Sequence, residues 1–153
     1  MRATIVGIYV GSKGGVPLHA ERQGVLVAGK GLVGDRYYDG VGSFSKPAIP
    51  PDAELTLIEI EEIERFNAEL REPFPIGAFR RSIVTQGIRL NDLVGKRFSV
   101  GGAVLEGKRL CEPCSHLAKL TTQSIVSKMA HRAGLRAQII SGGAIAVGDS
   151  IEA

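Results

Sequence analysis

Frequent, evenly spread glycines limit the possible folds of this chain more than any other feature of its sequence. The 153 residues include 20 glycines, which separate short apolar runs along the whole length. Many short strands bounded by turn residues are typical of barrels and sandwiches, so the pattern predicts a mainly β fold. The segments 3–10 and 81–110 fit this pattern best. A chain of this length forms one ordinary domain, and we expect a single domain over residues 1–153.

Two segments have helical features. The sequence ELTLIEIEEIERFNAEL (54–70) begins as a strand at 55–58 and then changes to a helical period. The segment 121–134 predicts a short helix that ends at Gly134. The glycine pairs at 101–102 and 142–143 each predict a hairpin turn. We therefore expect a mainly β domain with two modest helices.

Charge is distributed unevenly. Residues 1–75 carry 8 Lys and Arg against 11 Asp and Glu, whereas residues 76–153 carry 11 against 5. A basic second half favours an anionic partner such as a phosphate or a carboxylate. Nucleic acid is not expected, because the 5 Phe and 3 Tyr offer few stacking platforms. No apolar run reaches the roughly 18 residues of a spanning helix, and the start lacks a signal-peptide pattern, so we expect a cytoplasmic protein without membrane association.

Both cysteines lie in RLCEPCSHL, residues 109–117. A structural zinc site needs four ligands, and this stretch offers three, Cys111, Cys114 and His116. A thioredoxin-like redox pair belongs at the start of a helix in a βαβ unit, and the β-rich surroundings and Pro113 argue against it. Zinc and redox chemistry are therefore the weaker interpretations.

Two interpretations of the cysteines remain open on spacing alone. One is a pair of packed thiols, because a free cysteine is often a small buried apolar group. The other is a single functional thiolate, because Lys108 and Arg109 lie close by and cations favour the thiolate form. Soft metals select thiolate ligands, so the second interpretation includes a metal site.

The glycine-rich segment GKGLVGDRYYDGVGS (29–43) is a second candidate site. Its glycines could expose backbone N–H groups to an anion. It is not a Walker loop, because no GKS or GKT follows. The alternative is a surface loop in which Asp35 and Arg36 form a local ion pair.

The segment FRRSIVTQG (79–87) is a third candidate. Arg80 and Arg81 are adjacent, so in a strand they would point to opposite faces and one of them could face a ligand. Arginine suits bidentate binding of a phosphate or a planar heterocycle, and Ser82 and Thr85 add hydroxyl groups. The alternative is a solvated, charged strand end.

These segments in this order resemble a small bacterial MOSC-domain protein. The resemblance rests on GKGLVGDRYYDGVGSFS, LTLIEIEEIE, RRSIVTQGIRLNDLVGKRFSVGGAVLEGKRLCEPCSHL and HRAGLRAQIISGGAIAVGD, and it runs from about Gly7 to Asp149. The family is named for its similarity to the C-terminal domain of molybdenum cofactor sulfurase. The resemblance implies a single β-barrel-like domain, similar to the β-barrel domain of pyruvate kinase, with two or three short helices.

The resemblance also implies a cofactor and a site. The cofactor would be the molybdenum cofactor, Mo-molybdopterin, a pterin dithiolene that carries a phosphate. EPCSHL matches the Pro-Cys motif of the family, which implies that Cys114 ligates molybdenum and is the catalytic residue, with Cys111 and His116 secondary. The residues implied to line the cofactor site are Gly34, Asp35, Arg36, Arg80, Arg81, Ser82 and Thr85.

Two positions depart from the family pattern. The family often has Arg-Arg-Asn where this chain has Ser82, which has a shorter reach and fewer hydrogen-bonding atoms. The family often has His-Arg-Gly-Gly where this chain has Ala133 before Gly134, a mild cost if that position needs a positive φ.

The resemblance implies reduction of N-hydroxylated small molecules by two-electron transfer with cleavage of the N–O bond. A separate electron-transfer protein would supply the electrons, because the chain has no flavin, haem or iron–sulfur motif. The rival hypothesis is a sulfur carrier, in which Cys114 holds a persulfide and passes sulfur to a metal centre without turnover of its own.

Overall fold

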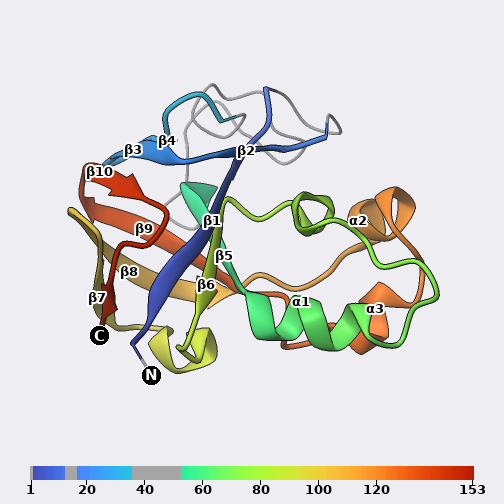
Figure 1. Cartoon of the computed structure of the whole chain (residues 1–153). Coiled ribbons are helices and arrows are strands. Elements are labelled where there is room, and N and C mark those ends of the chain that lie inside the picture. Colours follow the sequence, from blue (N-terminus) through green and yellow to red (C-terminus); the bar gives the residue numbers. More distant parts are fainter. Residues whose placement is uncertain (1, 13–16, 36–52) are drawn as a thin grey trace.

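The computed structural model describes residues 2–12, 17–35 and 53–153, with the side chains of Ser115 and His116 left out. The strands gather in one part of the described molecule, and α1, α2 and α3 lie together beside them (Figure 1). The described helices are α1 (Ile60–Asn67), α2 (Ser115–Leu120) and α3 (Ile125–Lys128), with two 3-10 helices, η2 (Ile76–Phe79) and η3 (Leu90–Leu93). This composition confirms the expected mainly β class with a few short helices.

Eight of the described strands form one mixed sheet in the order β11–β7–β8–β9–β5–β6–β1–β2. Their bounds are β1 Thr4–Val10, β2 His19–Glu21, β5 Leu55–Glu59, β6 Ile83–Gln86, β7 Arg97–Val100, β8 Ala103–Leu110, β9 Leu135–Ser141 and β11 Ile151–Glu152. A second sheet has the order β10–β3–β4, with β3 Gln23–Val27, β4 Gly31–Leu32 and β10 Gly143–Ala146.

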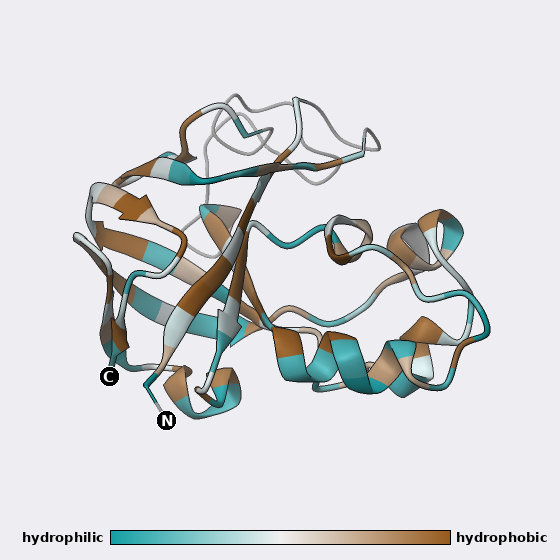
Figure 2. Ribbon diagram, in the orientation of Figure 1, coloured by the Kyte–Doolittle hydropathy of each residue, from teal (hydrophilic) through white to brown (hydrophobic). Residues whose placement is uncertain are grey.

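The strand-to-helix change predicted within 54–70 is confirmed. β5 runs directly into α1, and the chain returns through η2 to β6, which pairs parallel to β5. α1 buries Ile63 and Phe66, and much of the rest of its ribbon is hydrophilic (Figure 2). The ring of Phe66 meets that of Phe79 edge to face, with the centroids 5.9 Å apart. The helix is thereby packed onto the segment that precedes β6.

The two glycine pairs behave differently. Gly101 and Gly102 form the turn between β7 and β8, as predicted. The hairpin predicted at 142–143 is wrong, because β9 pairs with β8 and β5 whereas β10 leaves to pair with β3. A Cβ on Gly142 would lie 2.4 Å from the carbonyl oxygen of Leu26, and one on Gly143 would lie 2.3 Å from that of Gly102. These glycines permit the backbone to cross closely between the two sheets.

The helix predicted over 121–134 is also wrong in extent. Only Ile125–Lys128 form α3, and a further helix, α2, precedes it. Thr121 has φ −129° and ψ −99°, which separates the two helices, and His131 has φ 61°, which no right-handed helix accommodates. Gly134 does mark a boundary, but it lies at φ 106° just before β9.

Backbone hydrogen bonds also connect the start of β1 to the segment that leads into β11. The Ile5 N–H donates to the Asp149 oxygen (2.9 Å), and the Gly148 N–H donates to the Ile5 oxygen (2.8 Å). The Ile151 N–H donates to the Ala3 oxygen (2.9 Å). The start of β1 and the C-terminal end of the chain accordingly lie close together in Figure 1. The described strand order still has β11 and β2 as its ends, so barrel-like closure stays a prediction.

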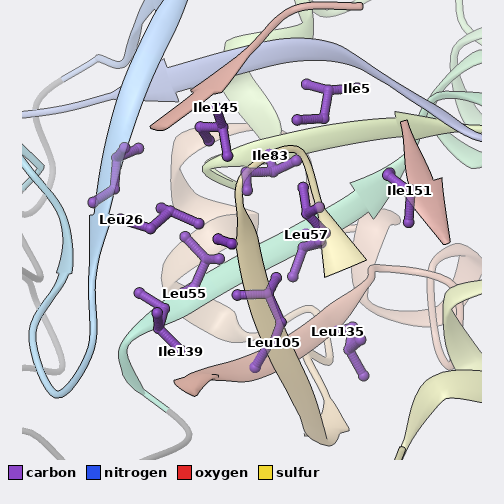
Figure 3. Close-up of a cluster of buried hydrophobic side chains, with 14 of the residues drawn as sticks. Ile5, Leu26, Leu55, Leu57, Ile83, Leu105, Leu135, Ile139, Ile145 and Ile151 are labelled. Carbon is purple, nitrogen blue, oxygen red and sulfur yellow. The ribbon is translucent and has the colours of Figure 1, made fainter. Parts of the chain in front are cut away.

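Two clusters of buried apolar side chains fill the interior. The sheet cluster is built from inward-facing residues of the strands and includes Leu26, Leu57, Ile83 and Leu105, which point toward one another in Figure 3. The helix cluster lies between the sheet and the helices. Its buried members are Ile58, Ile63, Phe66, Phe79, Val84, Leu117, Ala118, Ile125, Met129 and Ala133. The candidate site lies beside this helix cluster.

Candidate functional site

The four residues 111–114, which we call the cysteine loop, connect β8 to α2. Both cysteines are free thiols. Cys111 is only 3% exposed, whereas Cys114 is half-buried and packs against the helix cluster. Cys114 has extended backbone angles as the residue before α2, and its carbonyl accepts a hydrogen bond from the Ala118 N–H at 3.0 Å. Of the two cysteines, Cys114 is the more exposed residue.

Arg81 binds protein backbone rather than an open surface. Its guanidinium donates from Nε to the Ala133 oxygen (2.9 Å) and from Nη1 to the Phe79 oxygen (3.1 Å). From Nη2 it donates to the Cys111 oxygen (3.0 Å). Arg81 is 8% exposed, so these three bonds satisfy a buried charge. Its side chain thus connects η2, the cysteine loop and the segment before β9.

Arg80 occupies different surroundings from its neighbour. It follows η2 in the left-handed region, at φ 60° and ψ 38°, a conformation that costs a non-glycine residue about 1–3 kcal/mol. Its side chain lines a pocket of about 320 Å³, within the roughly 300–1,000 Å³ of small-molecule sites. The lining residues are Tyr9, Pro17, Leu18, Pro75, Ile76, Gly77, Ala78, Arg80 and Leu120. Among them Arg80 alone carries a charge, so the pocket is apolar with one cationic residue.

The pocket and Cys114 share a structural element. α2 begins immediately after Cys114 and contributes its last residue, Leu120, to the pocket. Cys114, Tyr9 and Ile76 also pack against the same helix cluster. The structure therefore connects Cys114 to the pocket through α2 and through the helix cluster.

Ser82 and Thr85 lie in the interior. Ser82 is 1% exposed, its N–H donates to the Thr56 hydroxyl (3.1 Å), and its carbonyl accepts from the Tyr9 N–H (2.8 Å). Thr85 is fully buried in β6, and its hydroxyl donates to the Ile58 oxygen at 3.4 Å. The contacts shown for these two residues are to protein atoms, and a cofactor role for them stays a prediction.

The glycine-rich segment is described only in part. Asp35 is 1% exposed and accepts a hydrogen bond from the Gly11 N–H at 3.0 Å. Gly34 has φ 86°, and no atom lies within 4 Å of where its Cβ would be. Arg36 lies outside the described residues, as does the rest of the segment that follows. Asp35 thus fixes the start of this loop against the end of β1.

Glu112 and His131 form a contact that sequence reasoning missed. One carboxylate oxygen of Glu112 accepts the His131 N–H (2.7 Å), and the other lies 2.6 Å from the His131 Nδ1. The Asn91 side chain donates to the His131 oxygen at 2.9 Å. Glu112 and His131 are separated by 19 positions, so no local spacing pattern announces the pair.

Two carboxylates, the buried Glu54 and the half-buried Glu59, are not among the residues that line the pocket. Burial raises the pKa of Glu54, although hydrogen bonds from the Ile139 and Gly29 N–H groups oppose this effect. Burial likewise raises the pKa of Glu59, which accepts a hydrogen bond from the Leu90 N–H at 3.3 Å. Both side chains satisfy backbone donors, which is a structural role.

The described residues contain no group of three or more His, Cys, Asp or Glu side chains arranged to hold a metal ion. The side chain of His116, which the zinc interpretation needs, lies outside the description. No helix in the described part of the chain is long and apolar enough to span a membrane.

Comparison with known proteins gives a family and a set of similar folds. The YuaD protein from Bacillus subtilis has a TM-score of 0.81 and 19% identity over 99% of this chain and 95% of its own. YiiM from Escherichia coli has a TM-score of 0.74 and 21% identity over 99% of this chain and 69% of its own. No curated protein sequence matches this chain. The sequence model of the MOSC domain matches residues 42–152, well over half of the chain. The protein therefore belongs to the MOSC domain family, as its motifs predicted.

Proposed function

We propose that this protein binds the molybdenum cofactor and reduces N-hydroxylated compounds, with Cys114 as the protein ligand of molybdenum. The observation that carries the proposal is the difference between the two cysteines. Cys114 has a free, half-buried thiol beside a pocket-lining helix, whereas the Cys111 thiol is buried. Membership in the MOSC family supports the choice of cofactor.

The residues at this site fit such a cofactor. A dithiolene pterin brings its own sulfur ligands to the metal, so the protein needs to add one soft donor, and the Cys114 thiolate is of that type. Arg80 places a cationic side chain in the neighbouring pocket, where it would bind the phosphate of the cofactor. When bound, the cofactor would supply two-electron redox chemistry.

The residues of the chain would bind and orient the cofactor. The apolar walls of the pocket, including Tyr9, Ile76 and Leu120, would exclude water and strengthen the interaction between Arg80 and an anion. The net reaction converts an N-hydroxyl compound, two electrons and two protons into the reduced compound and water. A separate electron-transfer protein would supply the electrons.

The first test is elemental analysis of protein from a host that makes the cofactor. We expect roughly one molybdenum per chain in the unaltered protein and in Cys111→Ala, and loss of the metal in Cys114→Ala. Cys111→Ala is a matched control, because it removes the other thiol of the same loop. Reduction of a hydroxylamine with an artificial electron donor then tests the activity. Loaded protein that fails this reduction would refute the proposed reaction.

A sulfur carrier is the alternative that the same observation allows. A free, half-buried thiol also suits a persulfide, because it is reachable yet partly protected. Incubation with a cysteine desulfurase, followed by mass spectrometry, would then show one added sulfur atom on Cys114. That result, with no molybdenum in any variant, would favour the carrier.

A further inference from the structure

The segment 131–134, which we call the platform, lies beside the cysteine loop. Two of its residues have unusual backbone angles. His131 has φ 61° and Gly134 has φ 106°, both in the left-handed region. A Cβ on Gly134 would lie 1.8 Å from the Leu57 oxygen, so the platform packs directly against the backbone of β5. Asn91 adds a hydrogen bond to the His131 carbonyl. The platform is therefore anchored to the sheet independently of the cysteine loop.

Three sets of contacts attach the cysteine loop to this platform. The Cys111 N–H donates to the Gly134 oxygen at 2.8 Å. Arg81 donates to the Cys111 and Ala133 oxygens together, and so bridges the loop and the platform. Both carboxylate oxygens of Glu112 contact His131, at 2.7 Å and 2.6 Å. All of these contacts hold the first two residues of the loop.

The remaining two residues transmit this restraint. Pro113 is buried and has its φ fixed by its ring. The residue before a proline is itself confined to extended conformations. Fixing Cys111 and Glu112 to the platform therefore limits where the backbone of Cys114 can lie.

We infer that Glu112 and His131, together with Arg81, are positioning residues that hold the Cys114 thiol in its half-buried orientation. This inference rests on the proposed role of Cys114 as the functional thiol. It assigns to the charged residue within CEPC a purpose that the motif alone does not reveal. It also gives Arg81 a role in positioning the thiol in place of direct contact with a ligand.

The test is the alkylation rate of Cys114 by iodoacetamide in the full chain without cofactor. A Cys111→Ala background leaves Cys114 as the only thiol and keeps every backbone contact of the loop. Glu112→Ala should raise the rate about tenfold, because it removes two contacts that involve a charged group. Glu112→Gln keeps an oxygen for the His131 N–H and should restore part of the protection.

The matched control is Glu69→Gln. It removes the carboxylate from the Lys128–Glu69 pair, at 2.9 Å. The two glutamates are exposed to a similar degree, and the control pair involves no residue of the cysteine loop or the platform. We expect no change in alkylation from it. Equal rates in the parent and Glu112→Ala would overturn the inference, as would equal acceleration in Glu69→Gln. Since no cofactor takes part, the outcome is independent of whether molybdenum binds.

A second variant changes the other partner of the Glu112–His131 contact. His131→Asn keeps a residue that tolerates positive φ while it removes the imidazole. We expect alkylation to accelerate less in this variant than in Glu112→Ala, because the backbone N–H of residue 131 still donates to Glu112. The combined variant should be no faster than Glu112→Ala. Additive effects of the two changes would contradict a shared contact.

Discussion

The sheet side and the helix side of this domain are stabilised in different ways. On the sheet side, backbone ladders set the position of each strand, and side chains such as Leu57 and Leu105 fill the space within. On the helix side, α2 has six residues and α3 has four, too short to be stable alone. Individual contacts hold the connecting segments there, such as those of Arg81 and Glu112.

This difference matters because Cys114 lies on the helix side. A short element held by a few polar contacts opens locally at lower cost than a strand inside a ladder. The position of Cys114 therefore depends on particular side chains, and we expect the strands to tolerate single changes at their surface. Four predictions test this contrast, in order of decreasing effect.

The largest effect is expected at the junction of the two sides. Gly134→Ala combines a positive φ with a Cβ 1.8 Å from the Leu57 oxygen, so backbone must move in β5 or the platform. We expect it to lower the free energy of unfolding by at least about 3 kcal/mol. Gly148→Ala is the control, because Gly148 has φ 98° but no atom within 4 Å of the added carbon, and it should cost about 1 kcal/mol. Urea denaturation measures both, and equal costs would show that the packing against β5 is unimportant.

Truncating a core side chain on each side should distinguish a loss of overall stability from a loss of protection of the Cys114 thiol. Leu105→Ala on the sheet side and Ile125→Ala on the helix side both remove fully buried side chains. Each should lower the free energy of unfolding by about 2–5 kcal/mol. Only Ile125→Ala should also raise the alkylation rate of Cys114 under native conditions. Equal acceleration in both variants would mean that the domain opens as one unit.

A smaller effect is expected from single polar contacts. The Asn67 side chain donates to the Phe74 oxygen at 2.9 Å and accepts from the Phe74 N–H at 3.1 Å. Asn67→Ala should cost about 1–2 kcal/mol in thermal or urea unfolding, because two half-buried backbone groups lose their partner. On the sheet side, Ser99→Ala removes an exposed 3.4 Å bond to the Glu152 oxygen and should change stability by less than about 0.5 kcal/mol. A larger loss of stability in Ser99→Ala than in Asn67→Ala would contradict the proposed difference between the two sides.

The smallest effect is expected from pH. Burial raises the pKa of Glu54 above the ordinary 4.5, so the folded state binds this proton more tightly than the unfolded state. Its contribution to stability is present below pH 4.5 and is lost as the pH rises through the folded-state value. Glu54→Gln should therefore be relatively more stable near about pH 7 than near about pH 4 when compared with the unaltered protein. Urea midpoints at the two pH values check the sign, and a difference in the opposite direction would contradict it.

The predictable parts of the fold were the ones encoded locally. The period change at 54–70 and the turn at Gly101–Gly102 depend on neighbouring residues, and both are confirmed. The hairpin at 142–143 failed because those glycines serve a close approach to Leu26 and Gly102, which only the packed sheets create.

The roles of the candidate site residues stay predictions. The family resemblance singled out Cys114, and the structure adds that Cys111 is the more buried of the two cysteines. The contacts of Arg81 with Cys111 and Ala133 were not predictable, because they join a side chain to backbone groups 30 and 52 positions away. The residues that make such contacts do not recur at a regular spacing, so the sequence alone does not reveal them.

The conformation of Arg80 has a consequence for engineering. Glycine at this position would adopt φ 60° without strain, so it is the substitution that a search for heat resistance would suggest first. The Arg80 side chain is buried, however, and among the described residues that line the pocket it is the one that carries a charge. Replacing it would relieve the backbone strain and at the same time remove the buried contacts of the side chain and its charge. The gain in the free energy of unfolding would therefore be smaller than the strain alone suggests.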